Sequence, residues 1–80
     1  MTATELRTFW RNAPFIPFDL VVPGRAKIRV PHPDFMSISP SGRIVHVWLS
    51  DDDWAALDIF LITAIETHSR NGKRSRTPRR

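Results

Sequence analysis

A two-residue alternation of apolar and polar side chains runs through the middle of the chain and constrains its fold most. Between residues 26 and 49, the runs AKIRV, MSIS and IVHVWL are separated by a proline-rich corner and a glycine turn. Period-two alternation places successive side chains on opposite faces of a β-strand. The stretch therefore predicts three strands. Because prolines cannot donate to a strand ladder, it also predicts a structural corner at Pro31, His32, Pro33 and Asp34.

The His32-Pro33-Asp34 tripeptide also occurs in J-domain co-chaperones, where it joins two helices. Here it separates two strand patterns, which favours a structural role. We expect an Asx-turn at Asp34, and we expect Phe35 or Met36 to return to the core.

A helix is predicted at the N-terminal side of these strands, over about residues 3–12. Thr2 and Glu5 have the spacing of a capping box, in which each side chain satisfies a free backbone donor. Pro14 lacks the N–H that a continuing helix needs. Apolar residues then share one helical face: Leu6, Phe9, Trp10 and Ala13.

A further strand is predicted where Phe18, Leu20 and Val22 alternate with their neighbours. We expect Phe15 and Phe18 to hold the helix against the sheet. The sequence Val22-Pro23-Gly24-Arg25 suits a type II turn, because glycine accepts the positive φ of its second central position. This turn would connect a hairpin.

The second half of the chain contains one clear strand and one ambiguous run. In IVHVWL we expect Val45, Val47 and Leu49 on one face, and Ile44, His46 and Trp48 on the other. A strand that is apolar on both faces is central or covered. Residues 54–66 fit either strands, favoured by their β-branched content, or a helix that begins near Asp53.

Together these elements predict an α+β, mainly β fold. The N-terminal helix is followed by a small, strongly bent antiparallel sheet or a five-stranded barrel. We expect one domain over residues 1–68, with a β meander over 18–66. Residues 69–80 contain nothing apolar to bury and predict a disordered tail. So small a chain without cysteine has no disulfide support, which favours a homo-oligomer. The absence of cysteine also fits a cytoplasmic protein.

The net charge of +4 is unevenly distributed. Residues 1–68 hold six basic and eight acidic residues, a net charge of −2, whereas residues 69–80 hold six basic residues and no acid. Alternate residues of a strand lie about 6.6 Å apart, close to phosphate spacing along a nucleic acid. The alternative is an ordinary solvated face balanced by Asp19 or Glu66. Candidate nucleic-acid contacts are Arg25, Lys27, Arg29 and Arg43, and in the tail Arg70, Lys73, Arg74, Arg76, Arg79 and Arg80.

Catalytic and metal chemistry have little support in the sequence. His32, His46 and Asp58 show no metal-ligand spacing, and no phosphate loop or nucleophile elbow is present. We therefore expect no enzyme activity, no metal, no cofactor and no small-molecule substrate. The apolar runs are also far shorter than the ~20 residues that a membrane helix needs.

The pattern PFxPF, HPDF, SPSGR and LITAIE resembles a widespread family of small bacterial proteins with no established activity. The resemblance covers about residues 6–66. It is carried by Pro14, Phe15, Pro17, Phe18, His32, Pro33, Asp34, Phe35, Ser39, Pro40, Gly42, Arg43, Asp58, Ile62 and Glu66.

The order of elements is similar to the Sm fold of the bacterial RNA chaperone Hfq, which has a helix before a bent five-stranded barrel and assembles into rings. Two departures matter. Ile59-Phe60-Leu61 stands where Hfq has a Lys-His pair for uridine, and the chain has no glutamine. The analogy therefore implies the architecture without that RNA pocket.

Two functions are consistent with these features. The first is a non-enzymatic nucleic-acid-binding module that uses the basic tail and the basic strand face. The second is a protein-interaction or structural adaptor that uses the exposed apolar strand at Ile44 and Trp48.

Overall fold

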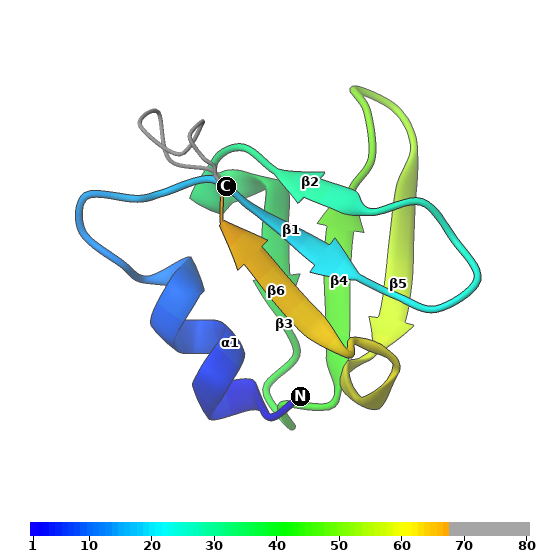
Figure 1. Cartoon of the computed structure of the whole chain (residues 1–80), viewed down its shortest axis with the longest axis horizontal. Coiled ribbons are helices and arrows are strands. Elements are labelled where there is room, and N and C mark those ends of the chain that lie inside the picture. The colour runs from blue at the N-terminus through cyan, green and yellow to red at the C-terminus, as the bar shows by residue number, and fades with distance from the viewer. Residues whose placement is uncertain (68–80) are drawn as a thin grey trace, which may run out of the picture.

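The computed structural model describes residues 1–67, which form one helix and two three-stranded antiparallel sheets. The elements in chain order are α1 (Ala3–Trp10), β1 (Phe18–Val21), β2 (Ile28–Val30), the 3-10 turn η1 (Pro33–Phe35), β3 (Met36–Ile38), β4 (Ile44–Trp48), β5 (Trp54–Asp58), the 3-10 turn η2 (Ile59–Leu61) and β6 (Ala64–Thr67). The strand order is β2-β1-β6 in the first sheet and β3-β4-β5 in the second (Figure 1). The predicted tail, residues 69–80, lies outside the described residues.

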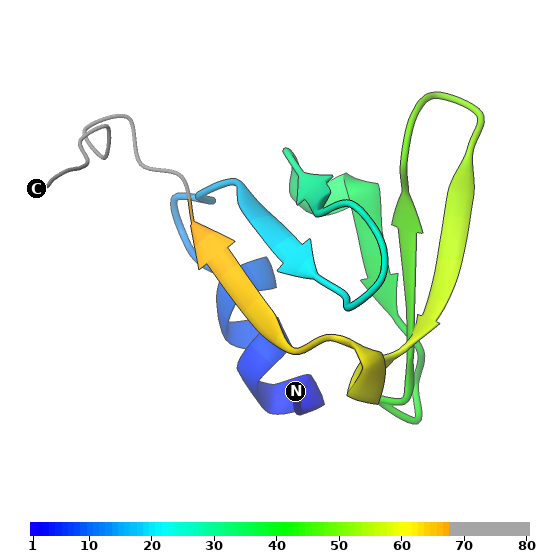
Figure 2. The ribbon, with the colours of Figure 1, turned by 45° about the vertical axis from the view of Figure 1, so that its right-hand side comes forward.

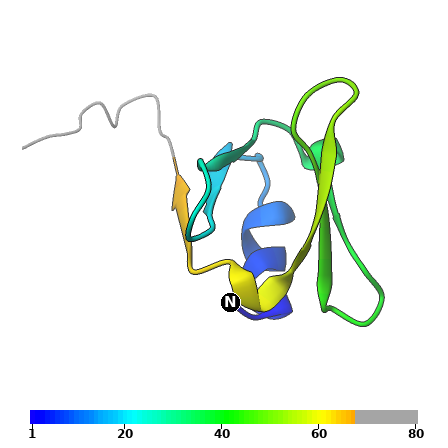
Figure 3. The ribbon, with the colours of Figure 1, turned by 90° about the vertical axis from the view of Figure 1, so that its right-hand side faces the viewer.

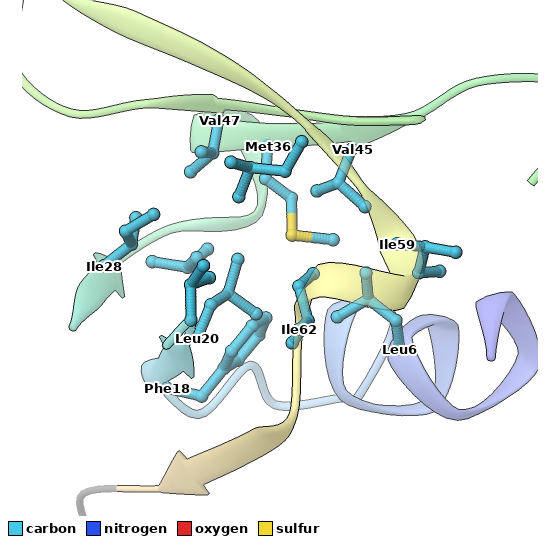
Figure 4. Close-up of a cluster of buried hydrophobic side chains, with 12 residues drawn as sticks. Leu6, Phe18, Leu20, Ile28, Met36, Val45, Val47, Ile59 and Ile62 are labelled. Carbon is cyan, nitrogen blue, oxygen red and sulfur yellow. The ribbon is translucent and has the colours of Figure 1, made fainter. Parts of the chain in front are cut away.

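The two sheets face each other and enclose the core between them (Figures 2 and 3). Inward side chains of both sheets meet there with residues of α1 and η2 (Figure 4). Five strand residues, Phe18, Leu20, Val30, Val45 and Val47, have no exposed surface. Alternation of buried and exposed residues along β2 and β4 follows from the period of a strand.

The helix begins and ends as its sequence predicts, to within two residues. The Thr2 hydroxyl accepts from the backbone N–H of Glu5, and the Glu5 carboxylate accepts from the backbone N–H of Thr2, which completes the capping box. Hydrogen bonds to the Glu5 carboxylate, from the Thr2 backbone N–H and then from the Thr2 hydroxyl, hold the pKa of Glu5 below its usual value. Leu6 is fully buried in the core. The rings of Phe9 and Phe15 lie 6.0 and 5.7 Å from that of Phe18, so the predicted aromatic anchor is confirmed.

The α+β, mainly β class is confirmed, but the barrel and the continuous meander are wrong. Six strands form two separate sheets that do not close on one another. Only β3-β4-β5 is a meander, because β6 pairs with β1 of the other sheet, with Leu20 opposite Ile65. The two 3-10 turns explain the separation: η1 interrupts the chain between β2 and β3, and η2 between β5 and β6.

The predicted corner at Pro31–Asp34 overlaps the 3-10 turn η1, which covers Pro33–Phe35. The side chain of His32, and not that of Asp34, makes the capping bond: His32 Nδ1 accepts from the backbone N–H of Asp34 at 3.2 Å. The predicted Asx-turn is therefore wrong. The carbonyl of Pro33 accepts from the indole N–H of Trp10 at 2.8 Å, which ties the corner to α1. Met36 then enters the core, as predicted.

Residues 54–66 are strands, and the helical alternative is wrong. β5 and β6 account for both ends of the run, and η2 lies between them. Two smaller predictions are also wrong: Leu49 is exposed rather than inward, and Ala26 is exposed and lies outside β2. The predicted type II turn is confirmed, because the N–H of Arg25 donates to the Val22 carbonyl and Gly24 has a φ of +83°.

Two glycines with positive φ provide a matched test of how α1 packs. A methyl group at Gly42 (φ +77°) would lie 3.1 Å from the Ala3 Cβ, whereas one at Gly24 (φ +83°) would meet nothing within 4 Å. The left-handed conformation alone costs an alanine roughly 1–2 kcal/mol. We expect Gly24→Ala to lose about that much stability and Gly42→Ala to lose more, measured by urea unfolding. Equal losses would show that α1 does not pack against the β3–β4 turn.

Candidate binding surface

The outer face of the β3-β4-β5 sheet carries large apolar side chains. Because the core takes Val45 and Val47, the alternate residues of β4 point outward, and β5 follows the same rule around Leu57. We call the outward aromatic and apolar residues of β4 and β5 the tryptophan face. It consists of Ile44, His46, Trp48, Trp54 and Ala56. Its largest members are exposed: Trp54 by 56%, Ile44 by 42% and Trp48 by 36%.

Three aromatic rings form the centre of this face. Trp48 and Trp54 are direct partners across β4 and β5, and His46 is opposite Ala56. The His46 ring lies 5.3 Å from the Trp48 ring, nearly perpendicular to it, and 5.0 Å from the Trp54 ring. Within residues 1–67, the indole N–H groups of Trp48 and Trp54 have no hydrogen-bond acceptor, unlike that of Trp10. The cluster thus presents both apolar rings and free donors to solvent.

An acidic loop joins the two tryptophan strands. Residues 49–53 close the hairpin: the N–H of Leu49 donates to the Asp53 carbonyl at 2.7 Å, and the N–H of Asp53 donates to the Ser50 hydroxyl at 3.2 Å. Asp51 and Asp52 are exposed and have no ion-pair partner in the described part of the chain. The tryptophan face therefore ends against three consecutive carboxylates.

The predicted basic stripe is divided by ion pairs. Arg29 Nε lies 2.8 Å from Oδ1 of the buried Asp19, and Lys27 Nζ lies 2.6 Å from Glu66 Oε1. The hydrogen bond to Glu66 and its charge raise the pKa of Lys27. Both carboxylates come from strands of the same sheet, β1 and β6. Two of the four predicted cations are thus balanced by Asp19 and Glu66, the residues expected to balance this face if it were an ordinary solvated face.

The remaining cations do not complete a stripe. Arg25 belongs to the turn before β2, and Arg43 precedes β4 in the other sheet, where its carbonyl accepts from the N–H of Ile59. A pocket of about 420 Å³ is lined by residues 25–29 and by Leu49. The six predicted tail cations, from Arg70 to Arg80, lie outside the described residues.

Metal ligands do not assemble within residues 1–67. No group of three or more histidine or acidic side chains there is arranged to hold a metal ion, so His32, His46 and Asp58 do not form a shared metal site. No helix in this part of the chain is long and apolar enough to cross a membrane.

The sequence pattern indicated Ile44 and Trp48, but it did not indicate Trp54, which lies opposite Trp48. The signal was present: a five-residue acidic loop between two tryptophans places them opposite each other once the loop closes a hairpin. The ambiguity of residues 54–66 concealed it, because a helix beginning near Asp53 would not have paired with β4.

Comparisons with known proteins found no match among family models, curated proteins or solved structures. The resemblance to a family of small bacterial proteins, and to Hfq, remains a prediction.

Proposed function

We propose that this chain is a protein-interaction module that binds its partner through the tryptophan face. The observation that carries this proposal is the exposed pair of Trp48 and Trp54. Tryptophan is enriched among the residues that dominate binding energy at protein interfaces. Contiguous exposed apolar surface on a small domain commonly marks such an interface.

The rigid placement of the two tryptophan side chains also supports binding at this face. Both tryptophans lie in paired strands, and His46 packs against each ring. Side chains that are already held in place lose little conformational freedom when a partner covers them, which lowers the entropic cost of binding. The charge around the face also favours a protein over a nucleic acid there, because Asp51, Asp52 and Asp53 repel phosphates.

The test is capture of a specific partner by the full chain, compared with two single variants. Trp54→Ser removes a ring from the tryptophan face. Phe60→Ser is the matched control, because Phe60 is even more exposed, at 73%, but belongs to η2. We expect one protein to be retained in high salt by the wild-type chain and by Phe60→Ser, and to be lost with Trp54→Ser.

Capture that is equally strong with Trp54→Ser would overturn the proposal. Capture that is lost equally with both variants would also contradict it, since that result indicates non-specific adhesion to exposed apolar residues. Light scattering after size-exclusion chromatography, with and without nuclease, reports whether the partner is a second copy of this chain.

Nucleic-acid binding is a second candidate function, favoured by the six cations and no acid in residues 69–80. Such binding is sequence-independent and depends on salt through counterion release. If the segment makes six phosphate contacts on duplex DNA, raising the salt from 50 to 200 mM should weaken its affinity roughly 10³-fold. Fluorescence anisotropy with a labelled duplex measures this. A chain with the six tail cations changed to glutamine should not bind the duplex. If that variant binds as well as the wild type, the tail is not the nucleic-acid-binding segment.

A further inference from the structure

The acidic loop and the tryptophan face form one continuous surface with two complementary features. The loop supplies carboxylates, and Trp54 follows Asp53 directly. A guanidinium group is suited to both, because it binds carboxylates with paired N–H donors and stacks on indole rings. The chain already contains one such contact: the Arg11 guanidinium carbon lies 5.4 Å from the centre of the Trp10 ring. The chemistry of the surface therefore matches an arginine-rich segment.

We infer that residues 69–80 of this chain dock on the acidic loop and the tryptophan face. This segment, SRNGKRSRTPRR, carries five arginines and one lysine without any acidic residue. The net charge of residues 1–68 is −2, so the segment and the remainder of the chain attract one another. The acidic loop is the densest cluster of negative charge in the sequence.

The length of the chain beyond β6 permits this contact. Residues 68–80 follow Thr67, and thirteen extended residues span about 43–47 Å. The longest dimension of the molecule is 40 Å. The segment can therefore reach the loop of its own copy or of a neighbouring copy. Because the segment is tethered, its effective concentration is on the order of millimolar, so individually weak contacts are sufficient.

This inference rests on the proposed function, because it assigns an occupant to the same surface. An external partner that binds the tryptophan face would have to displace residues 69–80. The segment would then make binding selective, since only a partner with more favourable contacts to Trp48 and Trp54 would compete.

The experiment uses the indole N–H resonances of the full chain in ¹H–¹⁵N NMR spectra after nuclease treatment. The Trp48 and Trp54 resonances report on the tryptophan face. Trp10, whose indole N–H donates to the Pro33 carbonyl, is the internal control. At low salt we expect the Trp48 and Trp54 resonances to differ between the wild-type chain and the chain with its six tail cations changed to glutamine. The difference should disappear in high salt, which screens exposed charges, and the Trp10 resonance should not move.

A second variant separates the loop from the general charge of the body. Asp51→Asn combined with Asp52→Asn should shift the two indole resonances toward their positions in the tail variant. Glu66→Gln, which removes a carboxylate from the other sheet, should not. Asp53 is left unchanged because it closes the hairpin. A difference that persists on dilution indicates docking within one copy, and one that fades indicates docking between copies; both support the inference.

Indole resonances that coincide in the wild-type and tail-variant chains at low salt would overturn the inference. That outcome would leave the proposed function intact if capture of a partner still depended on Trp54. Conversely, equal capture by the wild-type chain and by Trp54→Ser would overturn the proposed function. The NMR difference between the wild-type and tail-variant chains would still support docking of the segment.

Discussion

Phe18→Ala will destabilise the fold by about 3–5 kcal/mol, the usual cost of removing a fully buried aromatic side chain. Phe18 has no exposed surface, and its ring contacts both Phe9 and Phe15. It also lies in the central strand of its sheet, opposite Val30 on one side and Thr67 on the other. The substitution therefore weakens the junction of α1 with both neighbouring strands.

The measurement is urea unfolding followed by circular dichroism. Domains of this size are at the low end of the usual 5–15 kcal/mol of stability, so we expect most of the cooperative transition to be lost. Phe60→Ala is the control, because Phe60 is 73% exposed and its replacement should change stability by less than about 0.5 kcal/mol. If both variants unfold at the same urea concentration, the core is not built around Phe18.

Val47→Lys should prevent folding, whereas Ile44→Lys on the same strand should be tolerated. Val47 is fully buried between Met36 and Ala55 of the neighbouring strands. An uncompensated ammonium group there costs at least several kcal/mol, which is comparable to the whole stability of a small domain. Ile44 is 42% exposed on the opposite face, so a lysine there keeps its charge in water.

Amide spectra measure this difference directly. Val47→Lys should give the narrow range of chemical shifts that is typical of an unfolded chain, and Ile44→Lys should retain the dispersed spectrum of the wild type. A dispersed spectrum from Val47→Lys would mean that the two faces of β4 have been assigned the wrong way round.

Local features of the fold could be predicted because they depend on neighbouring residues. The capping box at Thr2, the glycine turn at Gly24 and the alternation along β4 each lie within a few positions of sequence. The pairing of β6 with β1 could not be predicted, because periodicity indicates a strand without naming its partner. The exposure of Leu49 could not be predicted either, because periodicity does not show that β4 ends at Trp48 and that the hairpin loop begins at Leu49.

The same distinction applies to the candidate surface. Ile44 and Trp48 follow from the pattern of a single strand, whereas Trp54 required the pairing of two. The ion pair of Lys27 with Glu66 joins residues 39 positions apart and requires β6 to lie beside β1. A basic stripe inferred from one strand therefore overestimated the unbalanced charge, because its partners came from distant parts of the chain.

The pairing of β1 with β6 has a consequence for how the protein is made. β1 is synthesised well before β6, the strand that covers one of its edges. Until residues 64–67 have been synthesised, Phe18 and Leu20 lack part of their sheet, and the nascent chain exposes an unpaired strand. Folding that depends on such distant contacts is also slow to begin. Translation must therefore pass residue 67 before the core between the two sheets can exclude water.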